Sequence, residues 1–149
     1  MSRLDPVDSQ LIALLQEDSR LSVATLAEKV GLSTSTCWRR ISALEKSGVI
    51  RKFSIVTDPQ AMGLGFKAIV HVQLARHDRA EIEAFFTAVR SKPEVRECYA
   101  TTGQSDCHLF VQCADLVAHN RFLDGFLYNM PAVASAQTNV VLRTIKPDT

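Results

Sequence analysis

The stretch VGLSTSTCWRRISALEKSGVI, residues 30–50, combines a turn, a cluster of small polar side chains, the chain's single tryptophan and two adjacent arginines. We expect Gly31 to end one helix in the left-handed conformation and Ser33 to cap the next. Advancing about 100° per residue places the apolar side chains of this second helix on one face. They are Cys37, Ile41 and Leu44. We therefore predict that this face is buried.

The opposite face of the same helix is polar and positively charged. It carries Ser35, Arg39, Ser42 and Lys46, with Thr36 and Trp38 on its flanks. Ala27, which allows close helix approach, precedes Gly31 by four residues, and a two-residue connection follows. This spacing is typical of a helix-turn-helix, whose second helix reaches DNA bases through residues near its N-terminus. The sequence thus predicts an element that packs on one side and binds DNA on the other.

The charge distribution supports this prediction. The whole chain has a net charge of +1, but residues 29–52 contain six cations and one anion, Glu45, which gives +5 locally and leaves −4 elsewhere. Hydroxyl groups and a helix N-terminus can hold phosphates, and Arg39 can pair with guanine O6 and N7. The candidate DNA-binding residues are Ser33, Thr34, Ser35, Thr36, Trp38, Arg39, Arg40, Ser42 and Lys46.

Several of these residues have an alternative interpretation that does not involve DNA. The basic stripe can be a solvated helix face, and Trp38 on the flank is expected to pack against a neighbouring helix or wing. Arg40 lies near the apolar stripe, so it can pair with a carboxylate of the protein instead of a phosphate. Cys37 is interpreted as a small core residue and not as a redox switch.

Two shorter helices are expected before this one. Asp5 can cap the first, with Pro6 at its first position, and Ser22 can cap the second, Val23 to Val30. After Gly48 the period changes, and residues 53–57 alternate as in a strand. We therefore predict a three-helix DNA-binding domain over residues 1–50, followed over residues 51–65 by a strand and hinge that form a winged or hinged extension of it.

Residues 66–149 follow a different pattern. Strands are expected at 66–75, 95–102, 107–113 and about 134–145, with one helix capped by Asp78 and another capped by Asp115. The order β-α-β-β-α-β predicts a ferredoxin-like domain, in which both helices cover one face of an antiparallel sheet. The chain is thus predicted to be of the α+β class, with a second domain over residues 66–149.

Some of these strands are apolar on both faces, and the chain has no further helices to cover the second face. Examples are Ile69 beside Val70, Phe110 beside Val111, and Val141 beside Leu142. A second copy of the chain is the simplest cover, so we predict a homodimer with its sheets packed face to face.

The composition further restricts the class of protein to which this chain can belong. The chain is 46% hydrophobic and 22% charged, and it has no apolar run near the roughly 20 residues that span a bilayer. The polar residues 1–6 make a secretory signal unexpected. The four cysteines form no C-x-x-C pair, which favours reduced thiols in a cytoplasmic protein. We find no catalytic pair, phosphate loop or metal cluster and expect neither an enzyme nor a cofactor. Cys107 and His108 are not expected to share a metal ion, because adjacent strand residues point to opposite faces.

The sequence resembles the Lrp/AsnC family of bacterial and archaeal transcriptional regulators. The resemblance rests on LDPVDSQLIALLQEDSR (4–20), LAEKVGLSTSTCWRRISALEKSGVI (26–50) and TTGQSD (101–106), in this order. It implies a ferredoxin-like C-terminal domain for dimerisation, assembly into octamers and amino-acid sensing. It also implies double-stranded DNA as a partner and an association with the nucleoid.

By this resemblance, the effector site involves the loop 101–106 at an interface between subunits. Backbone N–H groups around Gly103 could hold an α-carboxylate, and Asp106 or a neighbouring subunit an α-ammonium group. The candidate effector-binding residues are Tyr99, Thr101, Thr102, Gly103, Gln104, Ser105, Asp106 and Gln137. Without the resemblance, TTGQSD is interpreted first as a plain hairpin turn.

The function that these observations favour is a sequence-specific DNA-binding transcriptional regulator that responds to a small amino acid. Two alternatives were weighed against it. One is an enzyme built on the ferredoxin-like fold, and the other is an interaction or sensing module whose helix-turn-helix contacts protein. Saturable binding to duplex DNA in the presence of competitor DNA distinguishes them.

Overall fold

The computed structural model describes residues 4–75 and 78–146. The chain divides into two compact units, one extending to Val56 and the other beginning at Thr57. The outermost residues of the predicted domains, 1–3 and 147–149, lie outside the described part. In that part, no helix is both long enough and apolar enough to cross a membrane.

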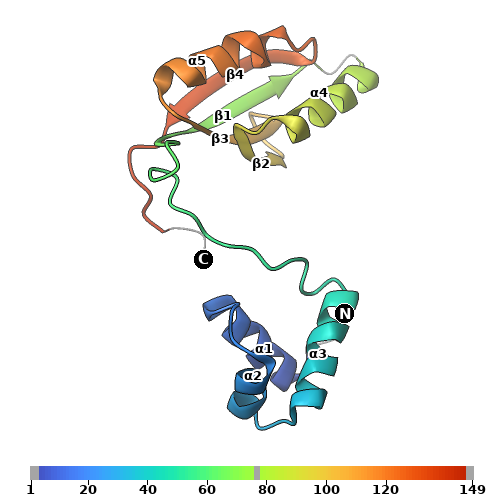
Figure 1. Cartoon of the computed structure of the whole chain (residues 1–149). Coiled ribbons are helices and arrows are strands. Elements are labelled where there is room, and N and C mark those ends of the chain that lie inside the picture. The colour runs from blue at the N-terminus through green and yellow to red at the C-terminus, as the bar shows by residue number, and fades with distance from the viewer. Residues whose placement is uncertain (1–3, 76–77, 147–149) are drawn as a thin grey trace. The chain divides into compact units, whose positions relative to one another are not determined.

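Three helices form the first unit (Figure 1): α1 (Pro6–Glu17), α2 (Val23–Val30) and α3 (Thr34–Lys46). The predicted caps are confirmed. The side chain at each of the three N-caps accepts a hydrogen bond from a backbone N–H group. Asp5 accepts from Val7 at 2.7 Å, Ser22 from Thr25 and Ser33 from Thr36. Gly31 has a φ of 68°, in the left-handed region, and so ends α2 as expected. The core of this unit consists of Leu11, Leu26, Ala27, Cys37 and Ile41.

The second unit is a four-stranded antiparallel sheet with two helices on one face (Figure 1). Its elements are β1 (Phe66–Leu74), α4 (Arg79–Ser91), β2 (Val95–Ala100), β3 (Cys107–Cys113), α5 (Leu116–Gly125), a short 3-10 helix (Leu127–Asn129) and β4 (Val133–Val140). The strand order is β2-β3-β1-β4. Alternate residues of β1, Ala68, Val70 and Val72, are buried and lie on the face that the helices cover. The predicted β-α-β-β-α-β order is confirmed.

The prediction of a strand over residues 53–57 is wrong. The structure assigns no regular secondary structure there, and the side chains of Ile55 and Val56 are more than four-fifths exposed. Alternating polarity is not sufficient for a strand, because the backbone also needs a partner to accept and donate hydrogen bonds. No strand in the described residues pairs with this segment, so the predicted wing is not formed there.

The last strand is shorter than predicted and ends at Val140, not near residue 145. Its partner β1 begins at Phe66. Just after the end of β4, a backbone hydrogen bond from Val141 N to Lys67 O, at 2.9 Å, still connects the chain to β1. Leu142 therefore lies beyond the sheet and is exposed. Strand β2 likewise ends at Ala100, before the expected Thr102.

The face of the sheet opposite the helices is only partly apolar. Ile69 and Phe110 face each other across β1 and β3 and point to this side. The next pair in the same register, His71 and His108, is polar. We call this side of the sheet the open face. It carries Ile69 and His71 of β1, Tyr99 of β2, His108 and Phe110 of β3, and Gln137 and Asn139 of β4.

Candidate DNA-binding and effector sites

Helix α3 presents the outward surface that the sequence predicts. Cys37, Ile41 and Leu44 are buried. Ser35, Arg39 and Lys46 are exposed, whereas Ser42 is half-buried. Ala43, which the sequence reasoning passed over, is also exposed, one turn after Arg39. Its i+4 spacing from Arg39 is the signal that would have placed it on this surface.

The hydroxyl groups at the start of α3 are connected to one another. Ser33 Oγ accepts the Thr36 N–H at 3.3 Å and donates to Thr36 Oγ1 at 2.8 Å. Ser33 Oγ also lies 3.2 Å from Ser35 Oγ. Ser33 and Thr36 are therefore engaged in capping the helix, while exposed Thr34 and Ser35 lie at the helix N-terminus, where an anion is favoured. The first turn of α3 contains no acidic residue.

Trp38 does not pack as expected. Its side chain is 62% exposed, so the expected contact with a neighbouring helix or wing is not supported. The indole is therefore accessible to a partner from its position on the flank of α3.

Arg40 makes the intramolecular pair that the sequence analysis left open. Its Nη1 lies 2.9 Å from Asp8 Oδ1 and 3.2 Å from Asp5 Oδ2. The Val7 N–H, and then the Arg40 guanidinium, hold the pKa of the Asp5 carboxyl below its ordinary value. A DNA phosphate would have to compete with two carboxylates for Arg40.

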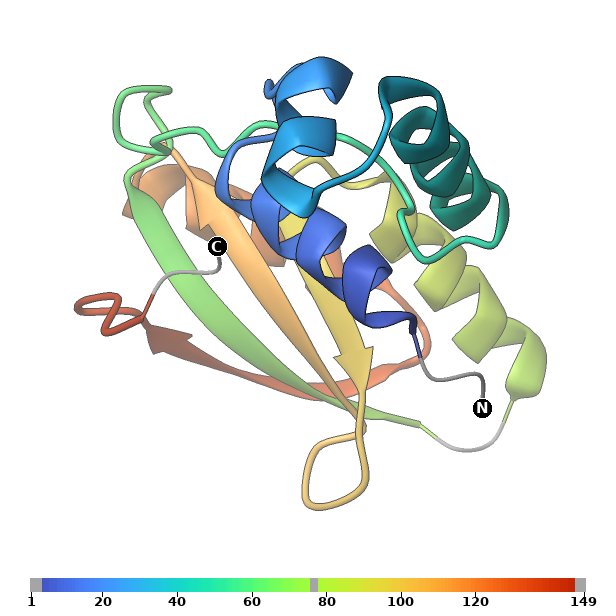
Figure 2. The ribbon, with the colours of Figure 1, turned by 90° about the horizontal axis from the view of Figure 1, so that it is seen from below.

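The loop 101–106 is fastened to the sheet by several hydrogen bonds. Thr101 N donates to Asp106 O at 2.9 Å, and Thr101 Oγ1 donates to Ser105 O at 3.1 Å. Asp106 Oδ2 accepts the Leu74 N–H at 2.8 Å, so an ammonium group would share this carboxylate with β1. Gly103 has a φ of 130°, a conformation that favours glycine. Figure 2 shows the loop extending past the end of the sheet.

Next to this loop, the open face holds a polar hollow of about 480 Å³. We call this cavity the polar hollow. It is lined by His71, Gln73, Thr102, Gln104, Ser105, His108, Ser135, Gln137 and Asn139. Four predicted effector residues lie in it: Thr102, Gln104, Ser105 and Gln137. The other four, Tyr99, Thr101, Gly103 and Asp106, do not line it.

Side chains of three strands are connected within the polar hollow. His71 Nδ1 lies 2.6 Å from His108 Nδ1, and Asn139 Nδ2 lies 2.9 Å from His71 Nε2. With Asn139 donating, neutral His71 carries its proton on Nδ1 and donates it to His108. Gln73 Nε2 donates to Gln104 O at 2.9 Å and so connects β1 to the loop.

Sequence reasoning missed most of these partners because they come together only through strand pairing. His71 and His108 are Cα partners in the β1–β3 register, although 37 positions separate them in the chain. Tyr99, on β2, pairs with His108 on β3, and the Tyr99 ring contacts the Phe110 ring edge to face. Its hydroxyl donates to Glu97.

Metal binding was considered for Cys107 and His108. Cys107 is fully buried in the core, whereas His108 lies on the open face, as their alternation in β3 predicts. Among the residues that the structure describes, no three His, Cys, Asp or Glu side chains are grouped to hold a metal ion.

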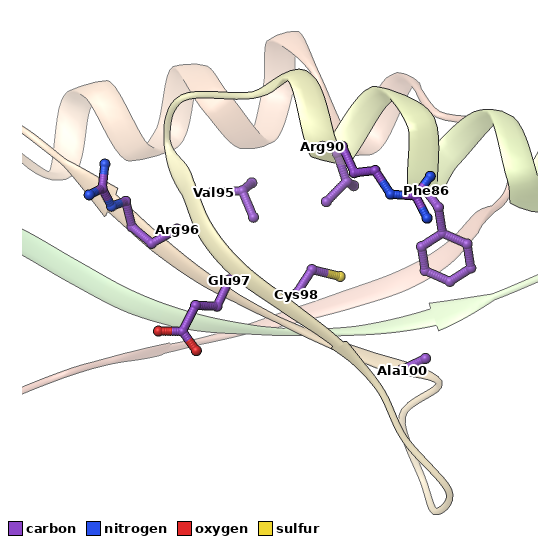
Figure 3. Close-up of a pocket in the computed structure, with 8 residues that line it drawn as sticks. Phe86, Arg90, Val95, Arg96, Glu97, Cys98 and Ala100 are labelled. Atoms are coloured by element: carbon purple, nitrogen blue, oxygen red, sulfur yellow. The ribbon is translucent and has the colours of Figure 1, made fainter. Parts of the chain in front are cut away.

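A second pocket, of about 410 Å³, lies between α4 and β2 on the helix-covered side (Figure 3). It is lined by Phe86, Val89, Arg90, Val95, Arg96, Glu97, Cys98 and Ala100. No sequence motif predicts a site at these residues.

Both units match known protein families. An AsnC-type helix-turn-helix domain model matches residues 4–45, and an Lrp/AsnC ligand binding domain model matches residues 67–149. Transcriptional regulator AzlB of Bacillus subtilis is 32% identical over 96% of this chain and 91% of its own length. The DNA-binding transcriptional activator DecR of Escherichia coli is 33% identical over 96% of this chain and 94% of its own length.

A solved structure is also similar over nearly the whole chain. It is the complex of transcriptional regulator NMB0573 from Neisseria meningitidis with L-Met, at 35% identity and a TM-score of 0.93. The alignment covers 99% of this chain and 95% of the other.

Proposed function

This chain belongs to the Lrp/AsnC family of DNA-binding transcriptional regulators, and we propose that α3 is its DNA-recognition helix and the polar hollow its effector site. The observation that carries the proposal is the division of α3 into a buried apolar stripe and an exposed basic surface. The enzyme alternative is set aside because the relatives are transcriptional regulators.

At the DNA, each exposed side chain of α3 has a chemical role. Thr34 and Ser35, at the helix N-terminus, hold a backbone phosphate. Arg39, one turn further along and exposed, reads guanine through O6 and N7. Lys46, in the last turn, pairs with a phosphate at the far side of the groove. Arg40 acts within the protein, positioning α3 on α1 through Asp5 and Asp8.

The effector is an amino acid held by the polar hollow and the adjoining loop. The L-Met bound by the similar Neisseria protein supports this class of ligand. Backbone N–H groups around Gly103 suit an α-carboxylate, while the Asp106 carboxylate of the adjoining loop and the Gln104 and Gln137 side-chain oxygens can accept from an α-ammonium group. The Gln73–Gln104 hydrogen bond couples the loop to β1, so a ligand there can shift the sheet that forms the interface.

We further propose that two copies pack open face to open face, and that such dimers assemble into octamers. Ile69, Phe110 and Tyr99 supply apolar area on this face, and Phe110 and Tyr99 are 38% and 53% exposed. A dimer would bury these side chains and enclose the polar hollow between subunits. Two α3 helices would then read a roughly palindromic site, at one DNA turn or a multiple of it.

The cellular setting follows from the DNA-binding role. The protein is proposed to act in the cytoplasm, on the nucleoid, of a bacterium or archaeon. The amino acid acts as an allosteric ligand only if it binds one assembly state better than another.

Two measurements test these proposals. Mobility shift with competitor duplex should show saturable binding, and its absence at low salt would contradict DNA recognition. Thermal unfolding with each of the twenty amino acids should show a rise in Tm for one or a few of them. Equal Tm values for all twenty would contradict an amino-acid effector.

A further inference from the structure

Two of the four cysteines are neighbours in the sheet. Cys98 lies on β2 and Cys107 on β3, and in the register Cys98 faces Leu109 while Ala100 faces Cys107. The two cysteines are therefore diagonal neighbours on the helix-covered side. Both cysteines are free thiols, and neither takes part in a disulfide.

Only one of the two is accessible. Cys107 is fully buried, whereas Cys98 is half-buried and lines the pocket between α4 and β2. Figure 3 shows the Cys98 sulfur pointing toward the side of the pocket where Phe86 and Arg90 lie. A small uncharged oxidant can thus reach Cys98 without unfolding the protein.

The chemical environment also distinguishes Cys98. The hydrogen bond from Cys107, and then the positive charge of Arg90, hold the pKa of the Cys98 thiol below its ordinary value. Burial raises the pKa of Cys37 and of Cys113, and the neighbouring Cys98, together with burial, raises the pKa of Cys107. Because the thiolate is the nucleophile, Cys98 is the cysteine in this chain suited to react.

We propose that Cys98 and Cys107 form a peroxide-oxidised dithiol, with Cys98 as the attacking thiolate and Cys107 as the resolving thiol. The Cys98 thiolate attacks one oxygen of hydrogen peroxide and breaks the O–O bond, and the hydroxide that leaves takes a proton to become water. The product is Cys98 sulfenic acid. The Cys107 sulfur then attacks the Cys98 sulfur and gives up its thiol proton to the departing hydroxyl group, which forms the S–S bond and releases a second water. The dithiol loses two electrons and the peroxide gains them.

The bond would act on the loop that follows β2. Cys98 and Cys107 bracket residues 99–106, and β2 is an edge strand that, in the described sheet, pairs only with β3. Diagonal Cα atoms on one face are roughly 7–8 Å apart. A disulfide requires them within about 7 Å. Closing it therefore draws the end of β2 toward β3 and shifts the start of the loop 101–106.

The test is oxidation of the full-length reduced protein. The protein is exposed to a small excess of hydrogen peroxide, its remaining thiols are alkylated under denaturing conditions, and it is digested for mass spectrometry. We expect a Cys98–Cys107 linked peptide while Cys37 and Cys113 remain alkylated. Full alkylation of Cys98, or equal oxidation of all four cysteines, would overturn the proposal.

Variants separate the two steps. In Cys107→Ser, whose hydroxyl can still donate a hydrogen bond but cannot form a disulfide, a sulfenic acid should accumulate on Cys98 and be trapped by dimedone, whereas Cys98→Ser should trap none. In the native protein at pH 7, iodoacetamide should modify Cys98 about tenfold faster than Cys37 or Cys113. Comparable rates at the three sites would contradict an activated Cys98 even if Cys107→Ser fails to fold.

The effect on the loop rests on the proposed effector function and is tested separately. The amino acid that raises Tm in the reduced protein should raise it less in the oxidised protein, and reduction should restore the response. A linked peptide with an unchanged response would overturn the coupling to the loop. If no amino acid raises Tm in the reduced protein, the effector proposal fails, while the linked peptide still decides the dithiol.

Discussion

Arg40 Nη1 lies 2.9 Å from Asp8 Oδ1, which joins helix α3 to the first turn of α1. The adjacent Arg39 is exposed, and no ion pair in the described residues involves it. Two neighbouring arginines therefore have different tasks. One holds the helix in place and the other is available to DNA.

Replacing these arginines one at a time should separate the two tasks. Arg40→Ala removes the only cation that pairs with Asp5 and Asp8 in the described structure, so the urea midpoint of unfolding should fall. Arg39→Ala is the matched control and should leave the midpoint unchanged. Equal midpoints for the two variants would contradict a structural role for Arg40.

The Asp5 carboxyl predicts a pH dependence of this stabilisation. Its pKa in the folded protein lies below the ordinary 3.8, so its contribution is present above pH 3.8 and is lost as the pH falls through the lowered value. Asp5→Asn should therefore lower the urea midpoint at pH 6 and have a smaller effect near pH 2.5. The same difference at both pH values would show that ionisation of Asp5 is not involved.

Asp106 should be needed for the amino-acid response through its charge. Asp106→Asn keeps an oxygen that can accept the Leu74 N–H but removes the negative charge that attracts an α-ammonium group. We expect a folded dimer in which the effector no longer raises Tm. Asp106→Ala should lose the response and also loosen the loop. An Asp106→Asn protein that responds normally would exclude the carboxylate from effector recognition.

The open face should be the dimer interface. Phe110→Glu places a charge in an apolar part of this face and should convert the dimer to a monomer, measured by sedimentation equilibrium. Val117→Glu, at a similarly exposed apolar residue on α5, is the control and should remain dimeric. Dissociation by Val117→Glu alone would place the interface on the helices.

Local signals in the sequence were sufficient to predict much of the fold. The caps at Asp5, Ser22, Ser33, Asp78 and Asp115 mark the helix starts because each side chain bonds to backbone only two or three residues away. The buried stripe of α3 follows from helical periodicity alone. Both features depend on residues that are close in the chain.

What could not be predicted depends on distant partners. Residues 53–57 alternate like a strand but pair with no strand among the described residues, and the pairing of β4 with β1 ends at Val140 and Ala68. The polar hollow exists because strand pairing brings His71 next to His108 and Gln137 next to His71. No local pattern specifies that register. The polar hollow therefore entered the candidate site only in part, through the loop residues and Gln137.

The most direct test of the central claim is the base preference of the protein and of its Arg39→Ala variant. Both proteins would select duplexes from a random pool, and the affinities of the selected duplex and its single-base variants would be measured by fluorescence anisotropy. We predict a selected site with two related half-sites, and in Arg39→Ala a loss of preference at one guanine per half-site worth roughly 1–3 kcal/mol. Unchanged base preference, or an equal loss of affinity for every duplex, would contradict base reading by Arg39 on α3.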